Sequence, residues 1–530
     1  MAQILIRPVM RTRGAARPRH RLGAVLLAVA LLAGCGAGAT SDPGDPVRIL
    51  AGAAATLDPA RAGDASSAGV IAQLYETVTA FDSSLTLRPA LAESWDVQDG
   101  GRRIVFRLRD GLTFSDGSRL EAQDVVRSWL RLLDPQQPSP LVSLILDVEG
   151  ALSFVRGDTS DPATVGLAAD GLEVTVELTR PAADFVTVVA GPSFAIVPPD
   201  IEAQRPGSFV GSGGYTVEAD DGRTTTLRAN PRYWAGEPAI AEVELVHDIG
   251  GRSPVQEFEA GDVDYAPIGD FDASWIAYDP TLGPQLREVP SLSVQYYGFD
   301  ASRPPFDDVR VRQAFGAAVD WRRIVELGSA GSETVANSMV PPGIPGASQR
   351  DFLPAHDPDE GRRLLAEAGF PGGAGFPVVT MLTGGGQHDE AIVTEIEREL
   401  GVEVTYETMS FDTYFDRLAN EPPHIWSLGW VADYPGPNDF LGVLLGSDSS
   451  NNYGRYRSAE FDAAIAEAGA ATDPATARAA YDRAEEIIQR DVPVVPLSYA
   501  TGWALSRPNL LGAGQNGLGT IRMAGLAWAD

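Results

Sequence analysis

Cys35 is the only cysteine of this 530-residue chain, and it follows a segment typical of an export signal. Six arginines and no acidic residue accompany the apolar run over residues 22–33, which is too short to span a bilayer as a mature helix. A single cysteine allows no intramolecular disulfide, so a hydrophobic core must stabilise the exported chain. At about 150 residues per domain, the length predicts roughly three domains.

The tetrapeptide Leu32-Ala33-Gly34-Cys35 resembles a bacterial lipobox. This resemblance implies cleavage before Cys35, lipidation of its thiol, and anchoring to the outer face of the cytoplasmic membrane. The alternative is an ordinary secretory signal with a chance cysteine. We therefore expect a lipoprotein signal peptide over residues 1–34 and a flexible tether over residues 35–45, which are rich in glycine and small polar residues.

The mature chain is strongly acidic. Without the six signal arginines, 35 basic residues remain against 72 acidic ones. This balance argues against nucleic acid as a partner, because its phosphates would be repelled. It weakly favours a cationic or zwitterionic ligand, and the alternative is a solvated acidic surface that keeps an exported protein soluble.

Several kinds of catalytic site are excluded by composition and spacing. The chain has no lysine, which removes Schiff-base, P-loop and Ser-x-x-Lys chemistry. Its five histidines are dispersed, and neither an HExxH nor a G-x-S-x-G motif occurs. We therefore expect no enzymatic activity, no metal site and no cofactor. An exported hydrolase and a purely structural envelope lipoprotein stay open as competing classes.

Strand and helix patterns alternate along the chain. Residues 103–109 (RIVFRLR) and 172–178 (LEVTVEL) alternate apolar and polar positions as half-buried strands do. Helical spacing of apolar residues predicts four helices. One follows Asp124, one extends from Asp307-Asp308 to Val325, one ends at Gly401, and one extends from Asp473-Pro474 to about residue 490. The predicted fold class is α/β.

A set of short motifs is spread over nearly the whole mature chain. The motifs are residues 57–59 (LDP), 74–82 (LYETVTAFD), 87–97 (LRPALAESWDV), 106–129 (FRLRDGLTFSDGSRLEAQDVVRSW), 211–218 (GSGGYTVE), 230–234 (NPRYW), 305–325 (PFDDVRVRQAFGAAVDWRRIV) and 429–441 (GWVADYPGPNDFL). Taken together and in this order, they resemble family 5 extracellular solute-binding proteins of bacterial ABC importers, the oligopeptide- and dipeptide-binding group.

The resemblance implies a type II periplasmic-binding fold of cluster C, in which two hinged lobes close on a ligand and the first lobe carries an inserted domain. Transferred to this chain, lobe I comprises residues 46–83, 205–297 and 499–530. The inserted domain comprises residues 84–204, and lobe II comprises residues 298–498. The hinge would lie near Tyr297-Gly298 and Ser498-Tyr499. The implied partners are a peptide ligand and a membrane permease, and we expect a monomer.

Asp433 is the acid of the 429–441 motif, where aromatic residues and prolines would partly remove it from water. In peptide-binding relatives the aspartate of this motif pairs with the α-amino group of the ligand. Gly429 would permit close backbone approach, so that main-chain groups near Trp430 and Ala432 could pair with an extended ligand. The alternative is that Asp433 caps a turn and that the aromatic residues, Tyr434 among them, belong to the core.

Tyr75 and Glu76 form a second candidate, since this family position lies near the cleft. Thr77 replaces the glycine that usually follows the glutamate, so an exposed position of Glu76 on a helix surface is the alternative. Trp275, Tyr278, Tyr296 and Tyr297 are candidates for side-chain pockets, with core or hinge packing as the alternative.

Two departures from the family pattern bear on the ligand. Leu141 stands where oligopeptide-binding relatives often have tyrosine, and the loop that begins at Thr383 lacks the arginine with which dipeptide-binding relatives hold the ligand carboxylate. A longer peptide is therefore favoured over a dipeptide. The alternative ligands are an oligosaccharide, a metal chelate and an amino-sugar conjugate.

Overall fold

The computed structural model describes residues 45–82, 84–137, 139–329, 333–409, 411–449 and 451–529. The predicted signal peptide, Cys35 and the tether up to residue 44 lie outside these ranges. Within them, no helix combines the length and the apolar character needed to cross a membrane.

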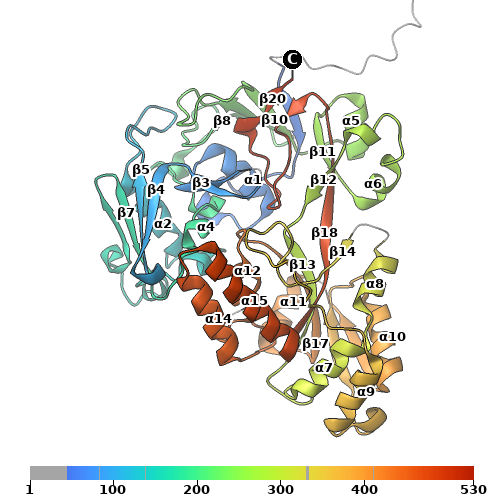
Figure 1. The fold of residues 1–530 in the computed structure, drawn as a ribbon. Coiled ribbons are helices and arrows are strands. Elements are labelled where there is room, and N and C mark those ends of the chain that lie inside the picture. Colours follow the sequence, from blue (N-terminus) through green and yellow to red (C-terminus); the bar gives the residue numbers. More distant parts are fainter. Residues whose placement is uncertain are drawn as a thin grey trace, which may run out of the picture. The chain divides into compact units, whose positions relative to one another are not determined.

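The described chain is organised around one mixed sheet of twelve strands (Figure 1). Its central strand is β18 (Val494–Ser506), which pairs with β13 through its first half and with β11 and β12 through its second half. The remaining strands extend the sheet on both sides of β18. In spatial order the sheet is β16 (Val404–Thr408), β15 (Val379–Thr383), β17 (Ile425–Val431), β13 (Ser293–Phe299), β18, β11 (Tyr265–Ile268), β1 (Val47–Leu50), β10 (Glu242–Val246), β9 (Thr224–Ala229) and β8 (Tyr215–Asp220), with β12 (Leu286–Pro290) and β14 (Glu333–Val335) also paired to β18.

The predicted lobe boundaries fall on this sheet. Ser498 pairs with Gln295 of β13, whereas Thr501 pairs with Pro290 of β12, so the partner of β18 changes on either side of the predicted crossing at Ser498-Tyr499. Tyr297 and Gly298 lie inside β13, which pairs with β17 along its whole length. The lobe boundaries stay a prediction.

A separate antiparallel sheet of four strands lies in the region predicted as the inserted domain. The two predicted strands are confirmed as β5 (Arg103–Leu108) and β7 (Glu173–Glu177), and the helix predicted after Asp124 is confirmed within α2 (Ala122–Leu130). Trp129 of α2 is fully buried and meets the rings of Phe106, Phe185 and Phe194 edge-on. The other strands are β4 (Ala92–Gln98) and β6 (Leu167–Asp170), and two short pairs join β2 (Thr79–Phe81) to β3 (Leu87–Pro89) and β19 (Leu510–Leu511) to β20 (Ala527–Trp528).

Two helix boundaries predicted from the sequence are confirmed, and one predicted helix is wrong. Gly401 ends α10 (Asp389–Leu400) in a left-handed conformation, and the Asp473 side chain caps the start of α15 (Pro474–Asp491). The single helix expected up to Val325 is wrong. It divides into α7 (Val309–Ala318) and α8 (Trp321–Gly328), because Val319 is extended and the Asp320 side chain caps the second helix.

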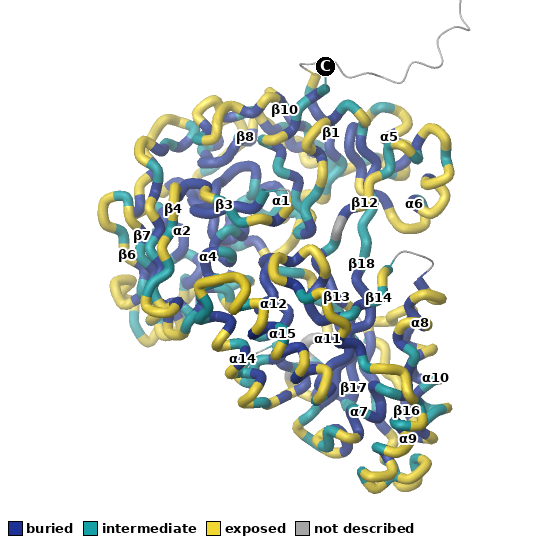
Figure 2. The backbone as a smooth tube through the Cα atoms, in the orientation of Figure 1, coloured by how far each residue is buried: buried dark blue, intermediate teal, exposed yellow. Residues whose placement is uncertain are grey.

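Buried side chains form the interior on both faces of the main sheet, and exposed residues concentrate on the loops and outer helix faces (Figure 2). The remaining helices are α1 (Ala65–Leu74), α3 (Ala151–Val155), α4 (Phe185–Val188), α5 (Pro254–Ala260), α6 (Asp270–Ile276), α9 (Pro358–Glu367), α11 (Phe411–Asn420), α12 (Pro437–Phe440), α13 (Gly442–Leu445) and α14 (Ala459–Ala470).

Candidate functional site

The predicted motif begins on β17 and continues into the turn before α12. One side of β17 pairs with β13 over its full length, from Ile425 to Val431. The other side pairs with β15 only at Ile425 and Trp426. Beyond Trp426, the Ser427 carbonyl accepts the Tyr414 hydroxyl of α11, and no strand of the described chain pairs with the rest of this edge of β17. Its main-chain groups therefore resemble a sheet edge that can accept an added strand.

Gly429 and Ala432 already have neighbours inside the protein. Gly429 lies opposite Gln295 of β13, and a Cβ atom at Gly429 would lie 2.4 Å from the Gln295 Nε2 atom. The N–H of Ala432 donates to the carbonyl of Leu292 at 2.8 Å. The close approach expected at Gly429 is thus made by the Gln295 side chain, and contact of these two residues with a ligand stays a prediction.

The Asp433 carboxylate is partly exposed and accepts no hydrogen bond from, and forms no ion pair with, any described residue. Burial raises the pKa of Asp433 to about 6, since little water remains to solvate its charge. The main-chain N–H of Asp433 donates to Oδ2 of Asp439 at 3.0 Å. The Asp433 carboxylate can therefore bind a cation, and no described residue supplies one.

Asp439 is a second acid of this site, and it is not among the site residues predicted from the sequence. Its side chain lies on α12 and is completely buried. Oδ2 accepts the indole N–H of Trp430 at 3.2 Å as well as the N–H of Asp433. Burial and the charge of Asp433 raise the pKa of Asp439 well above its usual range. The available signal was a second acid six positions after the first in the motif.

Tyr434 is buried, and it packs with the hydrophobic core of the four-stranded sheet region. Its hydroxyl donates to Asp184 at 3.4 Å and accepts the side-chain amide of Asn438 at 3.0 Å. Gly436 gives room to the ring, because a Cβ atom there would lie 2.6 Å from it. The position is the core position left open as the alternative, and contact of Tyr434 with a ligand stays a prediction.

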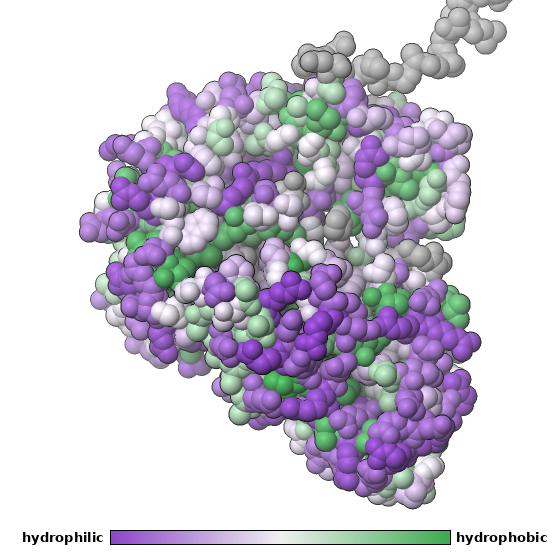
Figure 3. All heavy atoms as spheres, viewed as in Figure 1, coloured by the Kyte–Doolittle hydropathy of each residue, from purple (hydrophilic) through white to green (hydrophobic). Residues whose placement is uncertain are grey.

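An apolar groove of about 430 Å³ lies beside the turn of the motif. Pro435, Gly436 and Pro437 line this groove together with residues of β2, β3 and β4. Figure 3 shows hydrophobic residues gathered in a band at this part of the surface, left of centre. Other residues that line the groove include Phe81, Leu87, Trp95, Val97, Asp184 and Tyr481.

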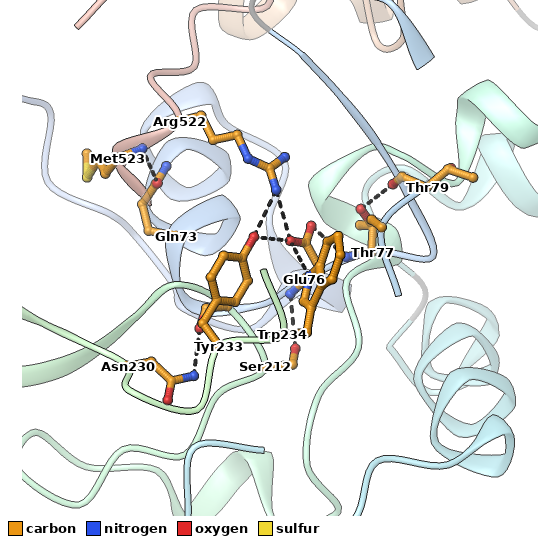
Figure 4. A network of polar contacts seen from close by, with 12 residues as sticks. Gln73, Glu76, Thr77, Thr79, Ser212, Asn230, Tyr233, Trp234, Arg522 and Met523 are labelled. Carbon is orange, nitrogen blue, oxygen red and sulfur yellow. Dashed lines mark hydrogen bonds and ion pairs between the residues drawn. The ribbon is translucent and has the colours of Figure 1, made fainter. Parts of the chain in front are cut away.

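Glu76 follows the end of α1, and its side chain is buried within a network of polar contacts (Figure 4). Oε2 accepts the Tyr233 hydroxyl, the Trp234 indole N–H at 3.1 Å and Nη2 of Arg522 at 3.0 Å. Oε1 accepts the N–H of Thr77 at 3.3 Å. The exposed helix-surface position is wrong for Glu76, since both carboxylate oxygens have protein partners.

Tyr75 ends α1 and is also buried. Its ring packs against Phe209 at 5.6 Å, and its hydroxyl has no hydrogen-bond partner among the described residues. Burial, together with the negative charge of Asp58, raises the pKa of the Tyr75 hydroxyl. Tyr75 and Glu76 border a cavity of only about 70 Å³, so their contact with a ligand stays a prediction.

The four aromatic candidates for side-chain pockets divide into two pairs. Tyr296 and Tyr297 are buried in β13, which agrees with the core alternative. Trp275 and Tyr278 are exposed, at 43% and 89% of their surface.

The loop after β15 is held by internal hydrogen bonds, because the hydroxyls of Thr383 and Tyr297 both donate to the Asp389 carboxylate.

Two further features of the described chain concern a second cavity and the placement of possible metal ligands. A larger cavity of about 770 Å³ lies elsewhere and is lined by Arg312, Arg455, Arg457 and polar residues of the loop after α13, and none of the predicted site residues reaches it. Across the described ranges, no three His, Cys, Asp or Glu side chains gather as a metal-binding group.

Comparison with known proteins identifies the family. The model of the bacterial extracellular solute-binding proteins, family 5 Middle, matches residues 86–452. The chain is 30% identical to the probable deoxycholate-binding periplasmic protein YgiS of Escherichia coli, with 86% of this chain and 87% of that protein covered. It is 28% identical to the periplasmic oligopeptide-binding protein OppA of Escherichia coli, with 86% of each covered.

Among solved structures, the periplasmic murein tripeptide-binding protein MppA in an unliganded open form superposes with a TM-score of 0.80 at 25% identity. The alignment covers 92% of this chain and 98% of that one. The type II periplasmic-binding fold predicted from the sequence is confirmed, with mixed α/β content and two lobes. The chain belongs to the family 5 bacterial extracellular solute-binding proteins, whose members capture solutes for ABC importers.

Proposed function

We propose that the protein is an exported, lipid-anchored receptor that captures oligopeptides between its lobes and delivers them to the membrane permease of an ABC importer. The observation that carries this proposal is the Asp433 carboxylate, which is partly buried and has no cationic partner in the described chain. A ligand ammonium group supplies the missing charge. The ligand also gains contacts only when the lobes close, which favours the closed state.

The electrostatic gain at Asp433 is large enough to decide between ligands. A charge-assisted hydrogen bond typically contributes about 1.5 to 3 kcal/mol. Deleting one partner of a buried charge pair costs roughly 2 to 5 kcal/mol, because the other charge stays buried without compensation. A peptide with a free amino terminus should therefore bind well, whereas its N-acetylated form should lose most of its affinity.

The open edge of β17 supports a peptide over other cationic ligands. Residues 428–431 have no strand partner on the β15 side in the described chain, so an extended main chain can pair there as an added strand does, beyond the Ser427 carbonyl that Tyr414 occupies. The loop after β15 offers no arginine for a ligand carboxylate, which favours a peptide whose carboxyl end extends beyond the site. Relatives named as oligopeptide-binding and murein tripeptide-binding proteins support the same ligand class.

An amphipathic acid is the second candidate. One relative is named as a probable deoxycholate-binding protein, and the apolar groove beside Pro435 and Pro437 would suit a rigid hydrophobic body. The negative charge of Asp433 opposes this candidate, because it would repel the acid group of such a ligand.

Native mass spectrometry of the purified protein, followed by fragmentation of any co-purified ligand, tests the proposal directly. A set of peptides with free amino termini is the expected result. A single non-peptide mass would refute the peptide ligand. In parallel, calorimetric titration with oligopeptides, their N-acetylated forms and deoxycholate separates the two candidates. A peptide receptor should bind the free peptides and bind the N-acetylated forms and deoxycholate poorly, whereas a receptor for an amphipathic acid should bind deoxycholate.

A further inference from the structure

Asp439 combines complete burial with incomplete hydrogen bonding. Its Oδ2 atom accepts two donors, the Trp430 indole and the Asp433 main chain. Its Oδ1 atom is buried and has no partner in the described chain. An ionised carboxylate in this position would be costly, because neither water nor a cation compensates for its second oxygen.

The charged groups around Asp439 add to this cost. Asp433 lies in the same turn, and Asp184 approaches from the residue before α4. Arg180 is the cation that acts on Asp184, but it forms its ion pair with Asp147, with Nη2 close to the Asp147 carboxylate. The other titratable neighbours are the hydroxyls of Tyr434 and Tyr481, which are neutral and buried.

Two carboxylates in one desolvated turn therefore meet no cation of their own. Burial raises the pKa of both groups above the usual range of aspartate, and the charge of Asp433 raises the pKa of Asp439 further. Because the two acids are close together, they titrate as a pair, and the first proton leaves more easily than the second. Near neutral pH we therefore expect one proton to stay on the pair, at Asp439, whose Oδ1 atom is buried without a partner, so that the pair carries one negative charge.

We propose that Asp439 is a positioning residue that holds the proton of the ammonium site, and that capture of a cationic ligand group releases this proton. The proposal rests on the proposed function, in which the ligand ammonium pairs with Asp433. When the ammonium arrives, the O–H bond of the protonated carboxyl breaks and the proton passes to solvent. The positive charge of the ligand then replaces that of the proton, and the net charge of the site stays unchanged.

This exchange makes ligand affinity dependent on pH. While the empty pair retains a proton that the complex lacks, affinity rises about tenfold per pH unit, up to the pKa of the ligand amine near 8. Acidification therefore releases the ligand. An N-acetylated ligand carries no ammonium and should bind without this dependence.

The substitution Asp439→Asn separates the proton-holding role from hydrogen bonding. The Asn carbonyl can still accept the Trp430 indole and the Asp433 N–H, so the turn is preserved, but no proton is held. Calorimetric titration with trialanine at pH 7, in phosphate and in Tris, measures protons released per ligand. We expect about one proton for the wild type and about none for Asp439→Asn, with a flatter pH profile of affinity. Equal proton release in both proteins would overturn the proposal.

The empty protein provides an arm that does not depend on ligand identity. The melting temperature of the wild type should fall relative to Asp439→Asn as pH rises from 5 to 8. The folded wild type holds the Asp439 proton more tightly than the unfolded chain does, and the stability that this proton contributes is lost as pH rises. Asp158→Asn, at an exposed position, should follow the wild type. Coincident curves for all three proteins would show that the pair holds no proton. Absence of trialanine binding at any pH, with divergent melting curves, would count against the proposed function alone.

Discussion

Arg522 Nη2 donates to Oε2 of Glu76 at 3.0 Å, although the two residues are 446 positions apart in the sequence. The same nitrogen lies 2.9 Å from the Tyr233 hydroxyl. Beside them, the N–H of Met523 donates to the Gln73 side chain at 3.0 Å. These contacts attach the C-terminal segment to the end of α1, and Arg522 is the cation that balances the buried Glu76 carboxylate (Figure 4).

Arg522→Ala should lower the free energy of unfolding by about 3 kcal/mol, because it leaves the Glu76 carboxylate buried without its cation. Urea unfolding followed by circular dichroism measures the loss. Arg363→Ala is the matched control. Arg363 pairs with two glutamates on an exposed helix face, so its loss should change stability little. Equal losses in the two variants would show that burial of Glu76 does not set the cost.

Glu485 should make stability decrease with rising pH. This side chain of α15 is buried, and burial raises its pKa from 4.5 to about 7. The folded state therefore binds a proton more tightly than the unfolded state, so the stability that this proton contributes is present below about pH 4.5 and is lost as pH rises through 7. The expected contribution is about 2 to 3 kcal/mol.

Glu485→Gln should remove this part of the pH dependence while the side-chain carbonyl keeps its contact with the Ser338 hydroxyl. Urea unfolding at pH 5 and pH 8 measures it as a smaller difference between the two pH values in the variant. Parallel pH dependence in wild type and variant would place the titrating proton elsewhere.

The helix and strand signals that the sequence carried were local ones. The Asp473 cap of α15, the glycine after α10 and the alternation in β5 each depend on a few neighbouring residues, and all three are confirmed. The break between α7 and α8 was missed because hydrophobic spacing continues across it. Only the capping side chain of Asp320 marks the interruption.

The candidate site was predictable in part. The motif singled out Asp433 through its family resemblance, and the structure places this residue just after the end of β17. A core position of Tyr434 was left open as an alternative, but the burial of Asp439 was not predictable, because it depends on how the turn after β17 folds back against Trp430. The partner of Glu76 was not readable either, because no local pattern links α1 to a residue near the C-terminus.

Asp433→Ala should abolish binding of peptides with free amino termini, with a loss of roughly 2 to 5 kcal/mol in binding free energy. The melting temperature of the empty protein should stay equal or rise slightly, because the substitution removes a partly buried charge that no described residue compensates. Calorimetry and thermal unfolding measure the two effects, with Asp158→Ala as the exposed control. Unchanged peptide affinity would remove Asp433 from the binding site.

Gly298 and Gly69 should respond in opposite directions to substitution by alanine. A Cβ atom at Gly298 in β13 would lie 2.1 Å from the indole ring of Trp426, which is itself buried against Tyr296. The indole cannot move aside without disturbing the core, so Gly298→Ala should cost about 3 kcal/mol. Gly69 lies within α1 with nothing within 4 Å of its added Cβ atom, so Gly69→Ala should add up to about 1 kcal/mol through helix propensity. Urea unfolding of both variants measures the contrast, and a loss at Gly69 as large as at Gly298 would contradict it.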